Sequence, residues 1–197
     1  MPGRSKVTGE YKMNVEEAVG KLHAGDIVIY HGTGFPSWAI RTFTGDEKTH
    51  TSMYLGNGKF AEAIYYNFLP LNKWGAIEKN PSEHSFSHCK KIEIYRPKTS
   101  EEIKQKAMNF AEGHAGDIRR YDSWNTVKYF LNALPFLKLR QSRRENKFYC
   151  SNLAIEAYKR NGFDILEDLE LDNTRLILPR DIVKSERLEI IGEFCFA

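Results

Sequence analysis

The segment over residues 50–64 constrains the fold of this chain most strongly. Its sequence, HTSMYLGNGKFAEAI, places two runs of apolar, aromatic and β-branched residues on either side of Gly56, Asn57 and Gly58. Glycine and asparagine readily adopt the left-handed backbone conformations that tight hairpin turns require. We therefore predict two antiparallel strands over residues 50–55 and 59–65, joined by a tight turn.

The length of that turn decides which side chains share a face of the hairpin. With a two-residue loop, Met53 would lie opposite Glu62, and the carboxylate would point away from His50. With a three-residue loop, Ser52 lies opposite Glu62, and His50 is its diagonal neighbour at about 7–8 Å between backbones. Three-residue loops with a left-handed glycine are common, and this register predicts that Glu62 orients His50. The alternative is a Glu62 side chain that binds a backbone amide or faces solvent.

The remaining periodicity predicts an α+β fold, because helices and strands are partly segregated along the chain. Residues 31–49 are expected to form a loop with one or two helical turns, and a second loop is expected to run to Pro81. Further strands are predicted over residues 26–30, 90–97 and 188–191. Helices are predicted over residues 14–23 and 150–160, after the capping pair Thr99 and Glu102, after Asp122 or Ser123, and as a short turn at Pro179.

Composition limits the class of protein. A chain of 197 residues with 41% hydrophobic residues is long enough to fold as one domain without disulfides or metals. We expect an amino-terminal extension with a short helix over residues 1–24 and a single domain over 25–197. The three cysteines form no disulfide framework, which favours a reducing compartment. A net charge of +3 is too small to indicate nucleic-acid binding.

The sequence also argues against secretion and membrane insertion. Its first 20 residues contain no apolar signal-peptide core, and no run of 18 apolar residues occurs. We therefore expect a cytoplasmic protein without a membrane span.

Cys150 is the candidate nucleophile. A reactive cysteine needs a base and is favoured at a helix amino terminus, where the helix dipole stabilises a thiolate. Cys150 lies at the start of the predicted helix FYCSNLAIEAYKRNG. Among the histidines, His50 is the best placed base because it opens a strand. The alternative is a small buried cysteine and a solvated strand histidine.

Several segments carry a resemblance to a known family. They are GDIVIY (25–30), HTSMYLGNGKFAEA (50–63), GDIRRYD (116–122), FYCSNLAIEAY (148–158) and LPRDIVKS (178–185). Together they resemble the circularly permuted branch of the NlpC-type papain-like cysteine hydrolases. This branch includes the YiiX- and YebB-like proteins, and lecithin retinol acyltransferase is a more distant relative. His50 precedes Cys150, which is the order of the permuted branch.

The resemblance implies a permuted papain-like fold: a small antiparallel barrel-like sheet, with helices packed on one side and the active-site groove between them. It implies a catalytic triad in which Cys150 is the nucleophile, His50 the base and Glu62 the third residue. Tyr121 matches the tyrosine that lines the groove near the oxyanion site. Further candidates are Ser151 for the groove and Tyr149, Arg143 and Arg144 for substrate binding.

These residues predict a cysteine hydrolase that cleaves an amide or ester through a thioester acyl-enzyme. Expected substrates are a small peptide, a peptidoglycan fragment or a lipid. A lipid acyltransferase with the same triad and a catalytically idle binding module are the alternatives. No cofactor and no metal are expected: His84, His88 and Cys89 lie close together but lack a paired CxxC or HExxH motif, so they are interpreted as a surface loop.

A basic stretch over residues 138–147 follows an apolar segment and contains Arg143 and Arg144. One interpretation is a contact with substrate or with anionic lipid beside Cys150. The other is a helix end packed on the core, followed by a solvated basic loop.

Overall fold

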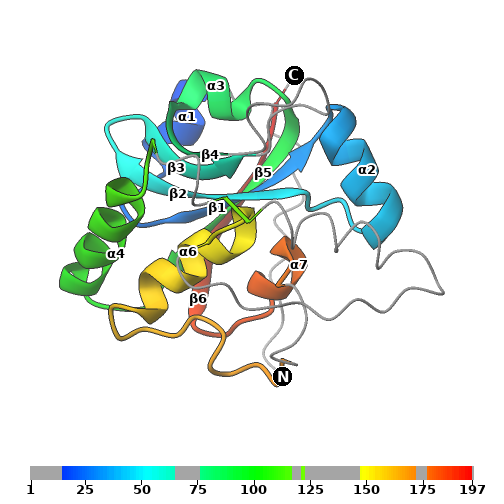
Figure 1. The fold of residues 1–197 in the computed structure, drawn as a ribbon. Coiled ribbons are helices and arrows are strands. Elements are labelled where there is room, and N and C mark those ends of the chain that lie inside the picture. Colours follow the sequence, from blue (N-terminus) through cyan, green and yellow to red (C-terminus); the bar gives the residue numbers. More distant parts are fainter. Residues whose placement is uncertain (1–14, 65–75, 117–120, 123–146, 172–176, 197) are drawn as a thin grey trace.

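The computed structural model describes residues 15–64, 76–116, 121–122, 147–171 and 177–196. The predicted helix after Asp122 or Ser123 and the candidates Arg143 and Arg144 lie outside these residues. The elements, shown in Figure 1, are α1 (Val15–Gly20), β1 (Ile27–Gly32), α2 (Phe35–Thr44), β2 (His50–Gly56), β3 (Lys59–Ile64), β4 (Ala76–Pro81), α3 (Ser82–Phe86), β5 (Cys89–Pro97), α4 (Glu101–Gly113), α6 (Cys150–Lys159), α7 (Pro179–Ile182) and β6 (Leu188–Cys195).

The strands form one antiparallel sheet in the order β4-β3-β2-β1-β5-β6. A barrel requires the first and last strands of a sheet to pair. Within the described part of the chain β4 and β6 are the two edges and do not pair. The sheet is therefore open, and the expectation of a barrel-like sheet is wrong for these residues.

Helices cover both faces of the sheet, so the prediction of helices on one side is also wrong. All six residues of β1 are buried, and a strand that is apolar on both faces must be covered twice. Ile27 and Ile29 pack with residues of α4, α6 and α7. Val28 and Tyr30 pack on the opposite face with residues of α1 and α3. Figure 1 shows these two helix layers above and below the sheet.

The hairpin has the register that the three-residue loop predicts. Ser52 pairs with Glu62, and the register shifts only between Tyr54 and the turn. All three loop residues have positive φ, at 91° for Gly56, 52° for Asn57 and 67° for Gly58. This turn therefore places His50 and Glu62 on the same face.

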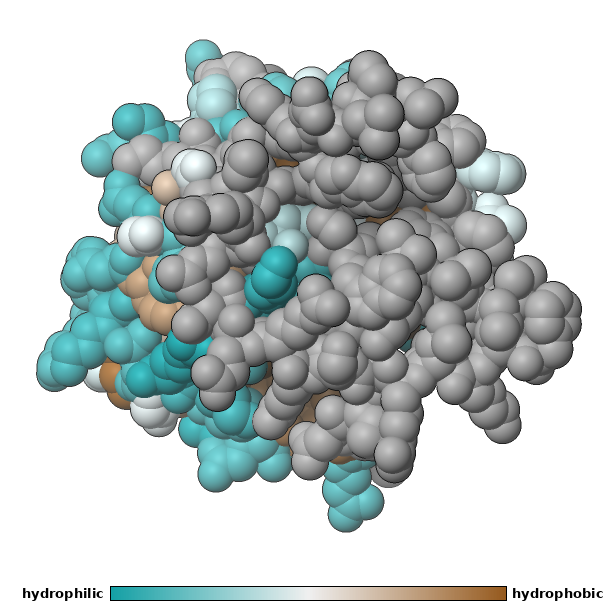
Figure 2. Space-filling model, in the orientation of Figure 1, coloured by the Kyte–Doolittle hydropathy of each residue, from teal (hydrophilic) through white to brown (hydrophobic). Residues whose placement is uncertain are grey.

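The helix boundaries follow the predictions with local differences. The predicted helix at Cys150 forms α6, and the Tyr158 hydroxyl ties it to the segment just before β1 by donating to the Gly25 carbonyl at 2.6 Å. The cap of α4 is Ser100 rather than Thr99: Ser100 has an extended backbone, and its hydroxyl accepts from the Ile103 amide. The sequence missed β4 and α3, and β6 is longer than predicted. The segment expected to be a loop with one or two helical turns contains the ten-residue helix α2. Figure 2 shows largely hydrophilic surface over α4.

Candidate active site

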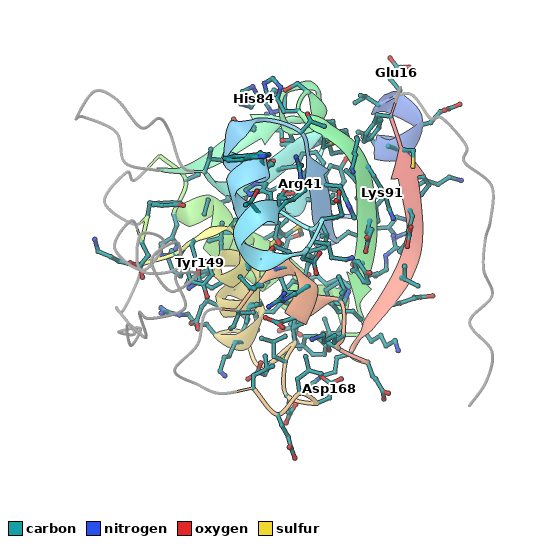
Figure 3. All side chains as sticks on the ribbon, turned by 90° about the vertical axis from the view of Figure 1, so that its right-hand side faces the viewer. Glu16, Arg41, His84, Lys91, Tyr149 and Asp168 are labelled. Atoms are coloured by element: carbon teal, nitrogen blue, oxygen red, sulfur yellow. The ribbon has the colours of Figure 1, made fainter. Side chains whose placement is uncertain are left out.

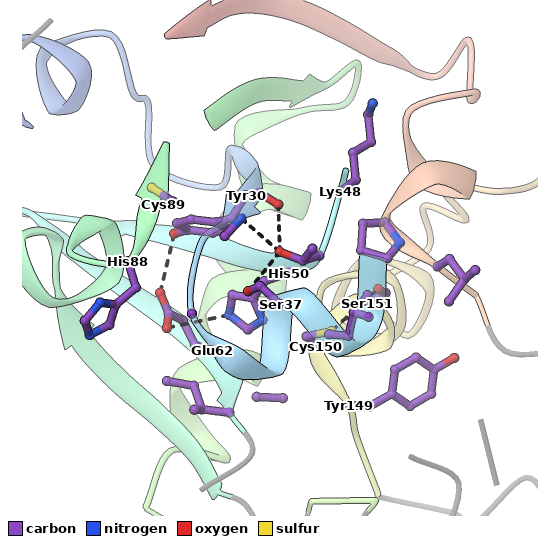
Figure 4. Close-up of a pocket in the computed structure, with 18 of the residues that line it drawn as sticks. Tyr30, Ser37, Lys48, His50, Glu62, His88, Cys89, Tyr149, Cys150 and Ser151 are labelled. Carbon is purple, nitrogen blue, oxygen red and sulfur yellow. Dashed lines mark hydrogen bonds and ion pairs between the residues drawn. The ribbon is translucent and has the colours of Figure 1, made fainter. Parts of the chain in front are cut away.

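The three predicted catalytic side chains meet at one end of the sheet. His50 is the first residue of β2, Glu62 lies in β3, and Cys150 begins α6. The His50 Nε2 atom lies 3.7 Å from Glu62 Oε2, and the imidazole lies close enough to the Cys150 thiol for each group to shift the pKa of the other. Figure 4 shows the His50 ring between Glu62 and Cys150. The order thiol, imidazole and carboxylate is that of a cysteine triad.

The local electrostatics favour a charged form of this triad. Burial by itself would lower the pKa of His50, but the Cys150 thiol and the Glu62 carboxylate raise it to about 10. Burial would raise the pKa of Cys150 and of Glu62, yet the His50 imidazolium holds both below their ordinary values. The three shifts describe one thiolate–imidazolium–carboxylate arrangement.

The start of α6 adds to the stabilisation of the thiolate. Tyr149 is the N-cap residue, and its backbone amide donates to the Asn152 side chain at 2.6 Å. The amide groups of the first turn point out of the helix, and the helix dipole places partial positive charge there. The hydroxyl of Ser151, which is buried, lies 3.8 Å from the Cys150 Sγ atom. Cys150 therefore lies in the first turn of α6, where the helix stabilises a negatively charged thiolate.

Glu62 is enclosed by polar groups that sequence reasoning missed. Its side chain is 3% exposed, and the Tyr30 hydroxyl donates to Oε1 at 3.4 Å. Asn80, on β4, donates from Nδ2 to Oε2 at 3.5 Å. The Tyr30 ring also lies against the His50 ring, with 5.3 Å between centroids. Tyr30 pairs with His50 across the β1–β2 ladder. Pairing the two predicted strands in this register would have placed Tyr30 beside His50 from the sequence.

The triad opens on a cavity of about 310 Å³. The candidates Tyr121, Tyr149 and Ser151 all line this cavity, and the Tyr149 hydroxyl accepts from the Ile177 amide at 3.0 Å. Helix α2 forms one wall, and Figure 3, which faces this helix, shows Tyr149 to one side of it. The cavity surface is largely apolar, and its apolar lining residues are Ile40 of α2 together with Ala63, Ile64, Ile177, Leu178 and Pro179.

A second buried histidine–glutamate pair lies on the opposite face of the sheet, and the sequence did not reveal it. His31 Nε2 lies 2.7 Å from Glu93 Oε1. The Tyr95 hydroxyl donates to Glu93 Oε2 at 2.8 Å, and Lys48 Nζ lies 3.4 Å from Oε1. Burial would raise the pKa of Glu93, but these donors and cations lower it to about 2.

The side chains His84, His88 and Cys89 all line the cavity, near Glu62. Both histidines are exposed. Burial, with a smaller effect of the Glu62 charge, raises the pKa of Cys89 to about 12. Across the described ranges, no group of three or more His, Cys, Asp or Glu side chains is arranged to hold a metal ion.

Comparison with known proteins identifies the fold. The sequence matches no family model and is not similar enough to any curated protein to be matched. The structure resembles that of YiiX from Escherichia coli O157:H7, which is described as a metalloprotein. The two chains are 17% identical, with a TM-score of 0.57, and the match covers 87% of this chain and 97% of YiiX. The chain therefore has a YiiX-like fold.

The word metalloprotein applies to YiiX, and it is not carried over to this chain. None of the described helices is long and apolar enough to cross a membrane.

Proposed function

We propose that this protein is a cysteine hydrolase that cleaves an amide or ester through a thioester acyl-enzyme. The observation that carries the proposal is that Cys150, His50 and the buried carboxylate of Glu62 line one cavity, with His50 paired to Glu62 and lowering the pKa of the Cys150 thiol. A cysteine with a lowered pKa at a helix amino terminus, beside a cationic imidazole, is the usual arrangement of a nucleophile.

In the first half of the reaction, the Cys150 thiolate attacks the substrate carbonyl carbon. The carbonyl π electrons move to oxygen and give a tetrahedral oxyanion. The oxyanion collapses as the bond to the leaving amine or alcohol breaks, and the His50 imidazolium gives that group its proton. The product of this half is a thioester on Cys150 and a neutral imidazole.

In the second half, neutral His50 removes a proton from water as the water oxygen attacks the thioester. The carbon–sulfur bond then breaks and releases the carboxylic acid. Cys150 returns to the thiolate and His50 to the imidazolium, so the cycle is balanced without a redox partner. Glu62 remains ionised throughout and keeps the imidazole oriented.

The oxyanion is assigned to the backbone amide of Cys150 at the start of α6. Tyr121 lines the same cavity, and we assign its hydroxyl as a second donor to the oxyanion. Donors of this kind contribute about 3–4 kcal/mol each to the stability of the transition state in other enzymes.

The fold and the chain order support membership of the permuted NlpC-like branch. The chain has a YiiX-like fold, and its histidine strand precedes its cysteine helix. Small peptides, peptidoglycan fragments and lipids are the proposed substrates, because the cavity is largely apolar but opens on a polar triad. Contact of Arg143 and Arg144 with substrate or anionic lipid, and a cytoplasmic location that keeps the thiol reduced, belong to the same proposal.

The test is to trap the acyl-enzyme. Wild-type protein and Cys150→Ala are incubated with a panel of peptide amides, isopeptides, peptidoglycan fragments and lipid esters, and the intact mass is followed with time. We expect a transient acyl adduct on Cys150, and none on Cys150→Ala. Turnover of the cleaved substrate should rise with pH as Cys150 ionises and fall again near pH 10, where His50 loses its proton.

Three outcomes separate the rival functions. Release of free acid identifies a hydrolase, whereas transfer of the acyl group to an added alcohol or amine identifies an acyltransferase. Turnover by Cys150→Ala at the wild-type rate would contradict the mechanism. Substrate binding without an adduct, together with an ordinary thiol pKa for Cys150, would identify a binding module.

A further inference from the structure

A short chain of buried hydroxyl groups ends on the Glu62 carboxylate. The Tyr30 hydroxyl oxygen lies 2.6 Å from Ser52 Oγ and 3.4 Å from Glu62 Oε1. Ser52 lies directly opposite Glu62 in the hairpin. All three side chains are buried, so water does not compete freely for these groups.

The direction of the hydrogen bonds follows from the number of protons. A tyrosine hydroxyl has one proton, and an ionised carboxylate only accepts. Ser52 can both donate and accept. The arrangement that satisfies all three groups is therefore donation from Ser52 to Tyr30 and from Tyr30 to Glu62. Burial, followed by the Glu62 charge, raises the pKa of Tyr30 well above its ordinary value, so Tyr30 keeps its proton and remains a donor.

Packing fixes Tyr30 in place. The residue is 2% exposed, and its ring contacts Phe86 at 6.0 Å and His50 at 5.3 Å between centroids. Tyr30 therefore touches the imidazole with its ring and the carboxylate with its hydroxyl. Replacement of Tyr30 by phenylalanine would remove the hydroxyl contact with Glu62 and preserve the ring contact with His50.

We propose that Tyr30 is a positioning residue: its hydroxyl, oriented by Ser52, donates to Glu62 and holds that carboxylate toward His50, which then keeps its proton beside the Cys150 thiolate. This inference rests on the proposed function, because it concerns the same triad. Loss of the Tyr30 hydroxyl leaves a buried carboxylate oxygen without this donor, which disfavours the ionised form of Glu62. The imidazolium then loses part of its counter-charge, and the Cys150 pKa rises.

Other titratable groups lie near this chain. Cys89 stays a neutral thiol through neutral pH, because its pKa is about 12. The titratable groups that face Tyr30 and Glu62 are His50 of β2, Cys150 of α6, Cys89 of β5, and His84 and His88 at the cavity wall.

The test measures the rate at which iodoacetamide alkylates Cys150 between pH 5 and pH 9, by mass spectrometry of the Cys150 peptide. It compares wild type with Tyr30→Phe and with Tyr95→Phe. Tyr95 is the matched control, because its hydroxyl donates to the buried Glu93 on the opposite face. We expect Tyr30→Phe to raise the midpoint of the pH profile by about one unit and to slow alkylation about tenfold at pH values well below the wild-type midpoint. Tyr95→Phe should leave the midpoint unchanged.

Ser52→Ala is the second variant and keeps the test decisive if Tyr30→Phe does not fold, as judged by circular dichroism. It should move the midpoint in the same direction by less, since Tyr30 keeps its hydroxyl but loses the group that orients it. A wild-type midpoint in the folded Tyr30→Phe protein overturns the inference. So does an equal shift in Tyr95→Phe, or an unchanged midpoint in Ser52→Ala when Tyr30→Phe does not fold. An ordinary thiol midpoint in wild type would instead overturn the proposed function itself.

Discussion

The His50–Glu62 pair and the His31–Glu93 pair are built in the same way on opposite faces of one sheet. In both, the glutamate lies diagonally across a strand ladder from the histidine. In both, a tyrosine hydroxyl donates to the carboxylate, from Tyr30 to Glu62 and from Tyr95 to Glu93. Diagonal pairing of a histidine with a buried glutamate and a tyrosine is thus not by itself a sign of catalysis in this fold.

The two pairs differ in the positively charged groups that lie near the carboxylate. Glu93 lies 2.7 Å from His31, and two lysines lie within 4 Å of the same oxygen. Among the described residues, His50 is the single cation paired with Glu62, at 3.7 Å, and His50 lines the same cavity as the Cys150 thiol, whose pKa it lowers. We infer from this difference that the His31–Glu93 pair stabilises the fold, and we propose that the His50–Glu62 pair stabilises a reactive thiolate.

The largest effect is expected for Glu93→Gln, measured as the free energy of unfolding in urea at several pH values. Because the folded-state pKa of Glu93 is about 2, against an ordinary value of 4.5, its ionised form stabilises the fold above about pH 5. This contribution, roughly 3 kcal/mol, is lost as the pH falls toward 2. In Glu93→Gln that part of the pH dependence should disappear.

Glu193→Gln is the control for this prediction, since Glu193 pairs with Glu93 in the ladder but is 51% exposed. We expect it to change stability by less than about 0.5 kcal/mol. A Glu93→Gln protein whose stability falls with acid as steeply as wild type would show that the buried pair does not stabilise the fold in this way.

The next effect concerns the two histidines. His50→Gln removes the cation beside Cys150, so the thiol should regain an ordinary pKa and its alkylation at pH 6 should slow about 100-fold. His31→Gln should lower the melting temperature and leave the alkylation rate within about twofold. Equal rates for the two variants would remove the functional distinction between the pairs.

A smaller effect is expected for Glu62→Gln. The amide oxygen can still accept from the imidazole, but the negative charge is gone, so the His50 pKa should fall and the Cys150 pKa should rise. We expect about a tenfold loss of turnover and of alkylation at pH 6. A loss as large as that of His50→Gln would mean that Glu62 does more than orient and balance the imidazole.

The hairpin and the cysteine helix could be predicted because local rules determine them. Gly56 and its neighbours favour positive φ, which selects the three-residue loop and the pairing of Ser52 with Glu62. The start of α6 at Cys150 follows from apolar residues at helical spacing. These two local elements contain all three triad residues.

The remaining features depend on contacts between distant segments. Strand β4 has no alternating pattern of its own and forms by pairing with β3. The contacts of Tyr30 with Glu62, and of His31 with Glu93, depend on which strands are neighbours in the sheet, and a single strand sequence does not specify that. The open, doubly covered sheet was missed for the same reason, although the fully apolar run Ile27–Tyr30 within β1 was visible in the sequence.

The pH dependence of Cys150 alkylation in the wild-type protein tests the proposed triad most directly. Cys89 is an internal reference within the same cavity, because its pKa of about 12 should leave it unlabelled through pH 9. We predict that Cys150 reaches its half-maximal rate well below the ordinary thiol value, because His50 lowers its pKa. A rate that is half-maximal near pH 8.5–9, as for an unperturbed cysteine, would contradict the thiolate–imidazolium pair and the cysteine hydrolase with it.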